Sequence, residues 1–315
     1  MQRVLVLDES ACGRLLAGSP LLDRLADGFR ALSSGDVVAP LRTEVVVDRG
    51  FSLAMPAYRR GGDIVVKIVN VFEGNLERGL PSHQAVICVF DAETGGCVAF
   101  LDGTAITARR TAGAAVLSTR LLAREDARTL TIVGAGVQGR AHLEMMPFAR
   151  DLEDIRIASL HREDAERLAS LDKRATAVGS LAEAVRSSDI VALCTHSGRP
   201  VIEAGWIQPG THITSVGYCE PLGELPRELF DMATLFVETR LAFEPVPVGC
   251  FELQGIEPTR GTEIGEVLAG IKPGRRSDDQ ITLYKAMGHA IEDHVATALV
   301  LEQANRAGEY ATLEL

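Results

Sequence analysis

A glycine-rich turn between an apolar strand and a helix constrains the fold of this chain more than any other feature. The apolar stretch Thr129–Val133 runs directly into Gly134-Ala-Gly136-Val-Gln-Gly139, and a helical pattern continues to about Ala149. In this context the spacing predicts a dinucleotide-binding turn: a tight turn, a close approach of backbone to pyrophosphate, and close packing of helix on strand. A purely structural glycine turn is the alternative. The predicted cofactor-binding residues of the turn are Gly134, Gly136, Val137, Gln138 and Gly139.

Strands and helices alternate after this turn. Short apolar stretches predict further strands at Ile155–Leu160, Ile190–Cys194, His212–Val216 and Leu235–Val237, with a helix at Glu163–Leu171. Such alternation is typical of a parallel sheet covered by helices on both faces. We therefore predict an α/β fold in which residues 121–289 form a Rossmann-type, doubly wound parallel-sheet domain.

The first hundred residues have a different pattern. Helical spacing at Leu21–Phe29 is followed by runs rich in β-branched residues at Val45–Val47, Ile64–Phe72 and Ala85–Phe90. These patterns predict an α+β domain over residues 1–120. A helical pattern at about Ile281–Ala304 predicts a long C-terminal helix that returns to this domain, so that residues 290–315 complete it.

Cofactor preference is expected to depend on the end of the second strand of the nucleotide-binding domain. An NAD site usually has an acid there that binds the ribose hydroxyls, but the predicted strand Ile155–Leu160 and the two residues after it contain no acid, and the next one is Glu163. Ser159, His161 and Arg162 can instead hold a 2′-phosphate, so we favour NADP(H) over NAD(H). The alternative is that Arg162 is an exposed helix residue. The segment after the strand Ile190–Cys194 is also expected to border the cofactor, through Thr195, His196 and Ser197.

Lys67 is one of only four lysines and stands inside the apolar run Ile64–Val69. Its neighbours on both faces of the predicted strand are apolar, so we expect a poorly solvated ammonium. Desolvation lowers the pKa of a lysine and suits it to proton transfer near neutral pH. The alternative is a lysine that extends from an edge strand into solvent.

Two arginines are candidates for binding a carboxylate. On the predicted helix Thr104–Ala123, Arg110 falls on the apolar stripe, so its guanidinium faces the interior and needs an anion. A substrate carboxylate matches its planar fork, whereas an ion pair with an internal acid such as Asp102 is the alternative. Arg42, just before the Val45–Val47 run, is a weaker second candidate.

Charge and composition argue against several classes of protein. The 43 acidic and 32 basic residues give a net charge of −11, which does not favour binding to nucleic acid or to anionic membranes. The amino-terminal apolar stretch is too short for a signal peptide, and no run reaches the length of a spanning helix, so we expect a cytoplasmic protein. The six cysteines form no C-x-x-C pair and the histidines do not cluster with them, so no metal site is predicted.

Several further segments together resemble the ornithine cyclodeaminase/mu-crystallin family over essentially the whole chain. The matching segments include Met55–Ala57, Gly79–Gln84, Asp102–Gly103, Thr107–Ala112, Leu122–Arg124, Gly134–Gln138 and Gly288–Asp293. The resemblance implies a homodimer, an N-terminal substrate-binding and dimerisation domain, and a Rossmann domain with a nicotinamide cofactor. It also implies chemistry on a small α-imino or α-amino acid.

The resemblance also implies roles for individual residues. Lys67 falls on the family's substrate lysine, and Arg42 and Arg110 fall on its carboxylate-binding arginines, with Thr111 beside the second. His83 follows a Gly-Leu-Pro turn within the family pattern and is a further candidate for substrate binding, with a hydrogen-bonded structural histidine as the alternative.

One position departs from the cyclodeaminase pattern. Cys219 stands where ornithine cyclodeaminases carry a catalytic aspartate, which puts deaminative cyclisation in doubt but not hydride transfer. The resemblance therefore favours an NAD(P)H-dependent reductase of a cyclic ketimine such as Δ1-pyrroline- or Δ1-piperideine-2-carboxylate. The alternatives are ornithine cyclodeamination, an alanine-dehydrogenase-like activity, and a non-catalytic NADPH- or ligand-binding protein of the mu-crystallin type.

Overall fold

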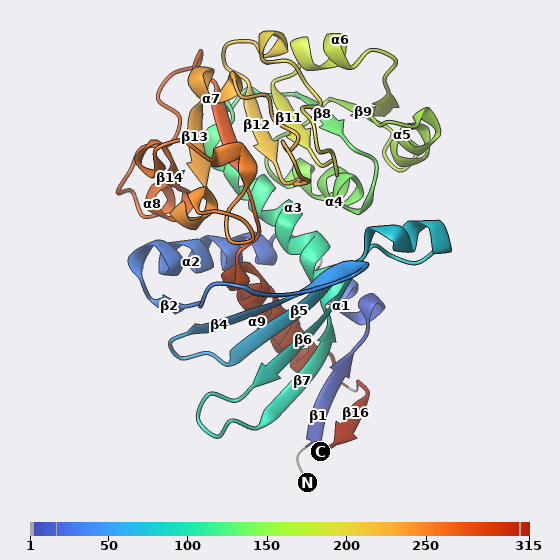
Figure 1. Ribbon diagram of the computed structural model, residues 1–315, viewed down its shortest axis with the longest axis vertical. Coiled ribbons are helices and arrows are strands. Elements are labelled where there is room, and N and C mark those ends of the chain that lie inside the picture. Colours follow the sequence, from blue (N-terminus) through green and yellow to red (C-terminus); the bar gives the residue numbers. More distant parts are fainter. Residues whose placement is uncertain (1–2, 17, 309) are drawn as a thin grey trace. The chain divides into compact units, whose positions relative to one another are not determined.

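The chain folds into two compact units, which Figure 1 shows as two assemblies of helix and strand. The computed structural model describes residues 3–16, 18–308 and 310–315, with no description of the Leu76 side chain. Unit 1 comprises residues 1–110 and 289–315, and unit 2 comprises residues 111–288. The sequence-based division was placed between 120 and 121. The structural division falls ten residues earlier because one continuous helix, α3 (Gly103–Leu122), passes from one unit into the other.

Unit 1 is built on one mixed sheet. Its strand order is β16-β1-β7-β6-β5-β4-β2, and β3 also pairs with β4. The pairs from β4 to β7 are antiparallel, whereas β1 runs parallel to β7. The strands are β1 (Arg3–Leu7), β2 (Val37–Val38), β3 (Thr43–Val47), β4 (Gly50–Arg59), β5 (Ile64–Val71), β6 (His83–Phe90), β7 (Cys97–Asp102) and β16 (Thr312–Glu314).

Helices cover one face of this sheet. They are α1 (Glu9–Leu15), α2 (Pro20–Ser34), the first part of α3, and α9 (Ala290–Ala307), with the short helix η1 (Glu73–Arg78) between β5 and β6. Figure 1 shows α9 lying behind β4 and β5, with which it is in contact. Strand β5 alternates accordingly: Val65 and Lys67 are buried, while Ile64 and Ile68 face away and are exposed. The sheet thus has one covered face and one open face.

Unit 2 is a parallel sheet of eight strands in the order β10-β9-β8-β11-β12-β15-β13-β14. The chain adds β9 and β10 on one side of β8 and then returns to add β11 and β12 on the other. Ligands of such sheets bind at the carboxyl ends of the strands, where the order reverses. The strands are β8 (Thr129–Val133), β9 (Asp154–Ala158), β10 (Ala175–Ala177), β11 (Ile190–Leu193), β12 (His212–Ser215), β13 (Thr234–Val237), β14 (Thr262–Glu263) and β15 (Thr282–Lys285).

The helices of unit 2 are short apart from the second part of α3. They are α4 (Val137–Met145), α5 (Arg162–Ala169), α6 (Leu181–Arg186), α7 (Leu229–Met232) and α8 (Ile264–Leu268), with single turns at η2 (Met146–Phe148), η3 (Ala204–Trp206), η4 (Arg240–Phe243), η5 (Phe251–Leu253) and η6 (Pro258–Arg260). The α/β Rossmann-type fold predicted for this part of the chain is confirmed. In the part of the chain that the structure describes, no helix is both long and apolar enough to cross a membrane. The cytoplasmic location stays a prediction.

One predicted element is wrong in its first part. The sequence pattern predicts a helix from about Ile281 to Ala304, but Thr282–Lys285 is strand β15 and α9 begins at Ala290. The strand is completely buried between β12 and β13, so its side chains do not alternate between a solvent face and a core face, and a short run without that alternation is ambiguous between helix and strand. Gly288, with a φ of 74°, separates the strand from the helix.

Candidate functional site

Lys67 is buried in unit 1 and lies against a carboxylate. Its strand β5 runs between β4 and β6, so the alternative of an edge-strand lysine reaching solvent is wrong: Lys67 is 1% exposed. The Nζ atom lies 2.6 Å from Oδ2 of Asp293, in the first turn of α9. Burial and the nearby Arg110 guanidinium lower the pKa of Lys67 to about 8, although the Asp293 carboxylate opposes them. This ammonium can therefore lose or regain a proton close to neutral pH.

Arg110 contacts two internal carboxylates. Its Nε donates to Oδ1 of Asp293 at 3.1 Å and its Nη1 donates to Oε2 of Glu292 at 3.2 Å, and the residue is 5% exposed. An internal ion pair was the alternative to substrate binding, but its acids come from α9. Asp102 instead accepts from the backbone N–H groups of Thr104 and Ala105 at the start of α3. Binding of a substrate carboxylate by Arg110 stays a prediction.

Asp293 joins the two cations. Burial would raise its pKa, but the Arg110 guanidinium and the Lys67 ammonium hold it below its usual value. Its two oxygens contact different partners, Oδ1 the guanidinium and Oδ2 the ammonium. Because a buried carboxylate is stable as an anion only beside such partners, these three groups form one buried, mutually dependent cluster.

His289 and Arg42 lie at the edge of the same cluster. The Nδ1 atom of His289 accepts from the backbone N–H of Ile291, and Oε1 of Glu292 accepts from the backbone N–H of His289 at 2.6 Å. Burial lowers the pKa of His289; the Glu292 carboxylate opposes this and the Arg42 charge adds to it. Arg42, in the segment between β2 and β3, is therefore electrostatically coupled to the cluster. Lys67, Arg42 and Arg110, selected separately from the sequence, come together in unit 1 with His289, Glu292 and Asp293.

The other two substrate candidates are less directly placed. His83 is the exposed first residue of β6, and its Nδ1 lies 3.1 Å from the hydroxyl of Ser82. Thr111 is buried and follows Arg110 on α3, where it is the first residue of unit 2. Their roles toward a substrate stay predictions.

The glycine turn of unit 2 needs glycine at two of its three glycine positions. Gly134 has a φ of +110°, which favours glycine, and a Cβ atom there would lie 2.6 Å from the carbonyl oxygen of Cys194. A Cβ atom on Gly139 would lie 1.9 Å from the carbonyl oxygen of Gly134, so helix α4 can approach the strand only without a side chain. At Gly136, the N-cap of α4, a Cβ atom would meet nothing within 4 Å. The space beside Gly136 at the N-terminus of α4 is thus open, and binding of a phosphate there, beside Val137 and Gln138, stays a prediction.

The end of β9 carries the predicted 2′-phosphate residues. His161 is the N-cap of α5 and makes no side-chain capping bond, and Ser159 is half-buried. Arg162 is exposed and its Nε donates to Oε1 of Glu166 at 2.7 Å, four residues along the helix. Arg162 thus has the position that the sequence alternative describes, an exposed helix residue in a weak surface ion pair, and its contact with a 2′-phosphate stays a prediction.

The segment after β11 is held from inside unit 2. The backbone N–H and the hydroxyl of Thr195 both donate to Oε2 of Glu224, at 2.8 and 2.7 Å. Ser197 donates to the carbonyl oxygen of Arg199, and His196 is exposed. Because Gly134 packs against Cys194, this segment adjoins the glycine turn at the point where the strand order reverses.

Sequence reasoning missed the acidic half of the unit 1 cluster. His289, Glu292 and Asp293 belong to a segment that carries the family resemblance, and two adjacent acids among apolar residues were a usable signal. A helix that is expected to begin at Ile281 places them in its interior, whereas they lie at the N-cap and in the first turn of α9. The buried residue Glu224 gave no comparable signal.

The family model of the ornithine cyclodeaminase/mu-crystallin family matches residues 3–308. Ketimine reductase mu-crystallin of Mus musculus is 36% identical over 288 residues, covering 90% of each chain. The structure of Thermococcus litoralis Δ1-pyrroline-2-carboxylate reductase in complex with NADH and L-proline has a TM-score of 0.91 and 32% identity, covering 98% of this chain and 100% of that one. An archaeal alanine dehydrogenase dimer with bound NAD has a TM-score of 0.89 and 27% identity, covering 99% of each chain. The chain belongs to the ornithine cyclodeaminase/mu-crystallin family.

Proposed function

We propose that this member of the family reduces the C=N bond of a cyclic α-imino acid, with hydride from a nicotinamide cofactor. The observation that carries the proposal is the buried Lys67 ammonium, held by Asp293 beside the Arg110 guanidinium. Such a group can deliver a proton, and the Arg110 guanidinium beside it offers positive charge to a carboxylate. The named relatives, a ketimine reductase and a Δ1-pyrroline-2-carboxylate reductase, support the same substrate class.

Each residue then has a defined task. Reduction adds a hydride to the imine carbon and a proton to the imine nitrogen, and the nicotinamide, when bound, supplies the hydride. Arg42 and Arg110 hold the substrate carboxylate and fix which face of the imine is presented. Lys67 donates the proton to the nitrogen and becomes a neutral amine, which its low pKa allows. Asp293 keeps the ammonium in place before the transfer.

We propose NADP(H) as the preferred cofactor. The end of β9 has no acid for the ribose hydroxyls, and it presents His161 and Arg162 in exposed positions. The exposed large apolar side chains of Val137, the first residue of α4, and Leu160, two residues beyond β9, offer a surface for an adenine ring. The relatives with bound NAD or NADH support a nicotinamide cofactor in general. The preference for NADP(H) over NAD(H) is proposed from the residues of this chain alone.

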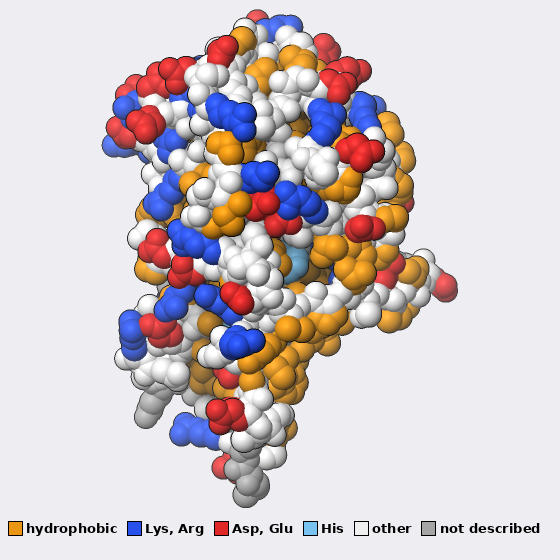
Figure 2. Space-filling view, turned by 90° about the vertical axis from the view of Figure 1, so that its left-hand side faces the viewer, with side chains coloured by type: hydrophobic (Ala, Val, Ile, Leu, Met, Phe, Trp, Pro, Cys, Tyr) orange, Lys and Arg blue, Asp and Glu red, His pale blue; other side chains and the backbone are white. Residues whose placement is uncertain are grey.

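We propose a homodimer formed through the open face of the unit 1 sheet. Ile68 and Val86 are paired across β5 and β6 on that face and are 36% and 40% exposed. In the lower part of Figure 2, hydrophobic side chains gather on unit 1 into an extended patch. A patch of this kind on a sheet usually marks an interface between proteins. Ile68→Glu should convert the dimer to a monomer in light-scattering measurements.

A steady-state screen tests the activity. Purified protein is incubated with Δ1-pyrroline-2-carboxylate, Δ1-piperideine-2-carboxylate, pyruvate with ammonia, or ornithine, each with NADH and with NADPH. We expect fast oxidation of the cofactor with a cyclic imine and faster reaction with NADPH. Proline and ammonia from ornithine would establish cyclodeamination instead. Activity only with pyruvate and ammonia would establish an alanine dehydrogenase.

The same screen separates an enzyme from a ligand-binding protein. Lys67→Met should reduce turnover by orders of magnitude and leave cofactor affinity nearly unchanged, whereas Lys173→Met, at an exposed lysine, should change neither. Tight NADPH binding without turnover of any substrate would refute the proposal and favour a non-catalytic protein.

A further inference from the structure

Three of the charged side chains that are buried in unit 2 lie close together, outside every group that the sequence analysis selected. Glu224 and Lys285 are 0% exposed and Glu252 is 4% exposed. Lys285 is the last residue of β15, at the carboxyl edge of the sheet, and neighbours the last residue of β12, Ser215. Burying such charges is costly unless each finds partners, so their contacts identify what they hold in place.

Lys285 makes three polar contacts through its ammonium group. Its Nζ donates to the carbonyl oxygen of Gly217 at 2.6 Å and to Oγ of Ser215 at 3.1 Å, and it pairs with Oε2 of Glu252 at 2.5 Å. Burial lowers the pKa of Lys285, but the nearby Glu252, Cys250 and Glu224 together outweigh burial and raise that pKa. An ammonium has three N–H donors, so each donor has a partner here.

Glu224 connects two separate loops. Its Oε2 accepts the N–H and hydroxyl of Thr195, from the loop after β11. Its Oε1 accepts the hydroxyl of Ser215 at 2.7 Å and the N–H of Gly217 at 2.8 Å, from the loop after β12. The backbone N–H groups of Glu224 and Leu225 in turn donate to Oε1 of Glu252. One carboxylate thus accepts four hydrogen bonds that join the ends of two neighbouring strands.

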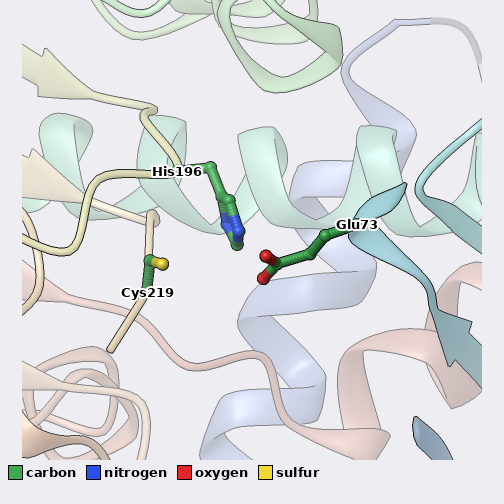
Figure 3. Close-up of side chains that lie close together, drawn as sticks. All are labelled: Glu73, His196 and Cys219. Atoms are coloured by element: carbon green, nitrogen blue, oxygen red, sulfur yellow. The ribbon is translucent and has the colours of Figure 1, made fainter. Parts of the chain in front are cut away.

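The two loops approach each other closely at Gly217. A Cβ atom on Gly217 would lie 2.1 Å from the carbonyl oxygen of Thr195. Beyond these anchored positions, the ring nitrogen of His196 and the sulfur of Cys219 come within 4.8 Å of each other, and Figure 3 shows them extending from the two loops. The loops lie at the carboxyl ends of β11 and β12, next to the reversal of strand order where a dinucleotide binds.

We propose that Glu224, supported by Lys285 and Glu252, is a positioning residue that sets the loops after β11 and β12 to receive the nicotinamide half of the cofactor. The proposal rests on the proposed function. The glycine turn and the end of β9 serve the adenosine diphosphate half, on the other side of the strand reversal. The two loops joined by Glu224 are then positioned to contact the nicotinamide and the ribose attached to it.

The four donors explain why a carboxylate is required. An ionised carboxylate is only an acceptor, whereas an amide has a single acceptor oxygen and an NH₂ group. In Glu224→Gln, the NH₂ group must face either the N–H of Thr195 or the N–H of Gly217, and two donors cannot bond to each other. One of the two loops therefore loses its anchor although the size and shape of the side chain are conserved.

The test compares two ligands that differ only in the nicotinamide half. Dissociation constants for NADPH and for 2′-phospho-ADP-ribose are measured by calorimetry on wild type and on Glu224→Gln. We expect the dissociation constant for NADPH to rise about tenfold and that for 2′-phospho-ADP-ribose to stay within about twofold. Ser215→Ala removes the hydroxyl between Lys285 and Glu224 and should also raise the dissociation constant for NADPH. This second variant provides the test if Glu224→Gln does not fold.

Glu238→Gln is the matched control. Glu238 is also buried in unit 2, but it accepts the backbone N–H groups of Met287 and Gly288 instead of the two loops. It should leave the ratio of the two dissociation constants unchanged. An equal loss for both ligands in Glu224→Gln and Ser215→Ala, or no loss for either, would overturn the inference. If wild type binds neither of these ligands but binds NADH and ADP-ribose, only the NADP(H) preference has failed, and the same comparison is made with that pair. If wild type binds none of the four, the proposed function itself has failed.

Discussion

Replacing Asp293 by Asn removes the anion that two buried cations share. The carboxylate contacts Lys67 Nζ at 2.6 Å and Arg110 Nε at 3.1 Å, and all three residues are nearly inaccessible to solvent. Removing one partner of a buried ion pair typically costs about 3–5 kcal/mol, because the remaining charge is left without compensation. We expect a loss of this size in the free energy of unfolding near pH 6, measured with urea.

The loss should depend on pH in a defined direction. In wild type the pKa of Lys67 is about 8, against 10.5 for an unperturbed lysine. Without the carboxylate it falls further, so the folded variant releases the Lys67 proton below pH 8 while the unfolded chain retains it. Between pH 6 and pH 8 the unfolded variant then binds more protons than the folded variant, so the free energy of unfolding of the variant rises with pH. That of wild type does not rise in this range, because its Lys67 keeps the proton up to about pH 8. The difference between them should shrink by about 1.4 kcal/mol for each unit by which the pKa of Lys67 is lowered.

Unfolding curves at pH 6 and pH 8, at constant ionic strength, measure this difference. Asp102→Asn is the control in unit 1: its carboxylate accepts from backbone N–H groups at the start of α3, so its cost should be similar at the two pH values. A loss below about 1 kcal/mol for Asp293→Asn would show that the ion pair is not a stabilising contact. An equal loss at both pH values would show that Lys67 does not respond to Asp293.

Three further predictions concern catalysis and the cofactor turn. Because Lys67 must be protonated to donate, kcat/KM for imine reduction should fall as pH rises through about 8, and a rate that is flat to pH 9.5 would exclude Lys67 as the acid. Arg110→Lys should raise KM for the imino acid by about tenfold, since a point charge cannot replace a fork already shared with Asp293 and Glu292; an unchanged KM with a lower melting temperature would make Arg110 purely structural. Gly139→Ala should cost about 2–3 kcal/mol or more, because its Cβ atom would lie 1.9 Å from a carbonyl oxygen, whereas Gly136→Ala should keep stability and lower cofactor affinity; the opposite ranking in thermal unfolding and NADPH titration would contradict the assigned geometry.

Local patterns were sufficient for much of the fold and for the cations of the site. The apolar stretch and three glycines at 129–139 specify strand, turn and helix because each step depends on neighbours within a few residues. The burial of Lys67 followed from the apolar residues around it on β5, and the inward direction of Arg110 followed from helical periodicity. Each of these inferences uses only the side of an element on which a residue lies.

Tertiary structure alone decided what those cations meet. Asp293 and Glu292 reach Lys67 and Arg110 from α9, near the other end of the chain, because that helix packs on β4 and β5. The same limit applies in unit 2, where Lys285 and Glu224 share the hydroxyl of Ser215 only because β15 inserts between β12 and β13. Periodicity reports that a charge is buried, but the identity of its partner depends on which distant elements pack together, and no local pattern encodes that choice.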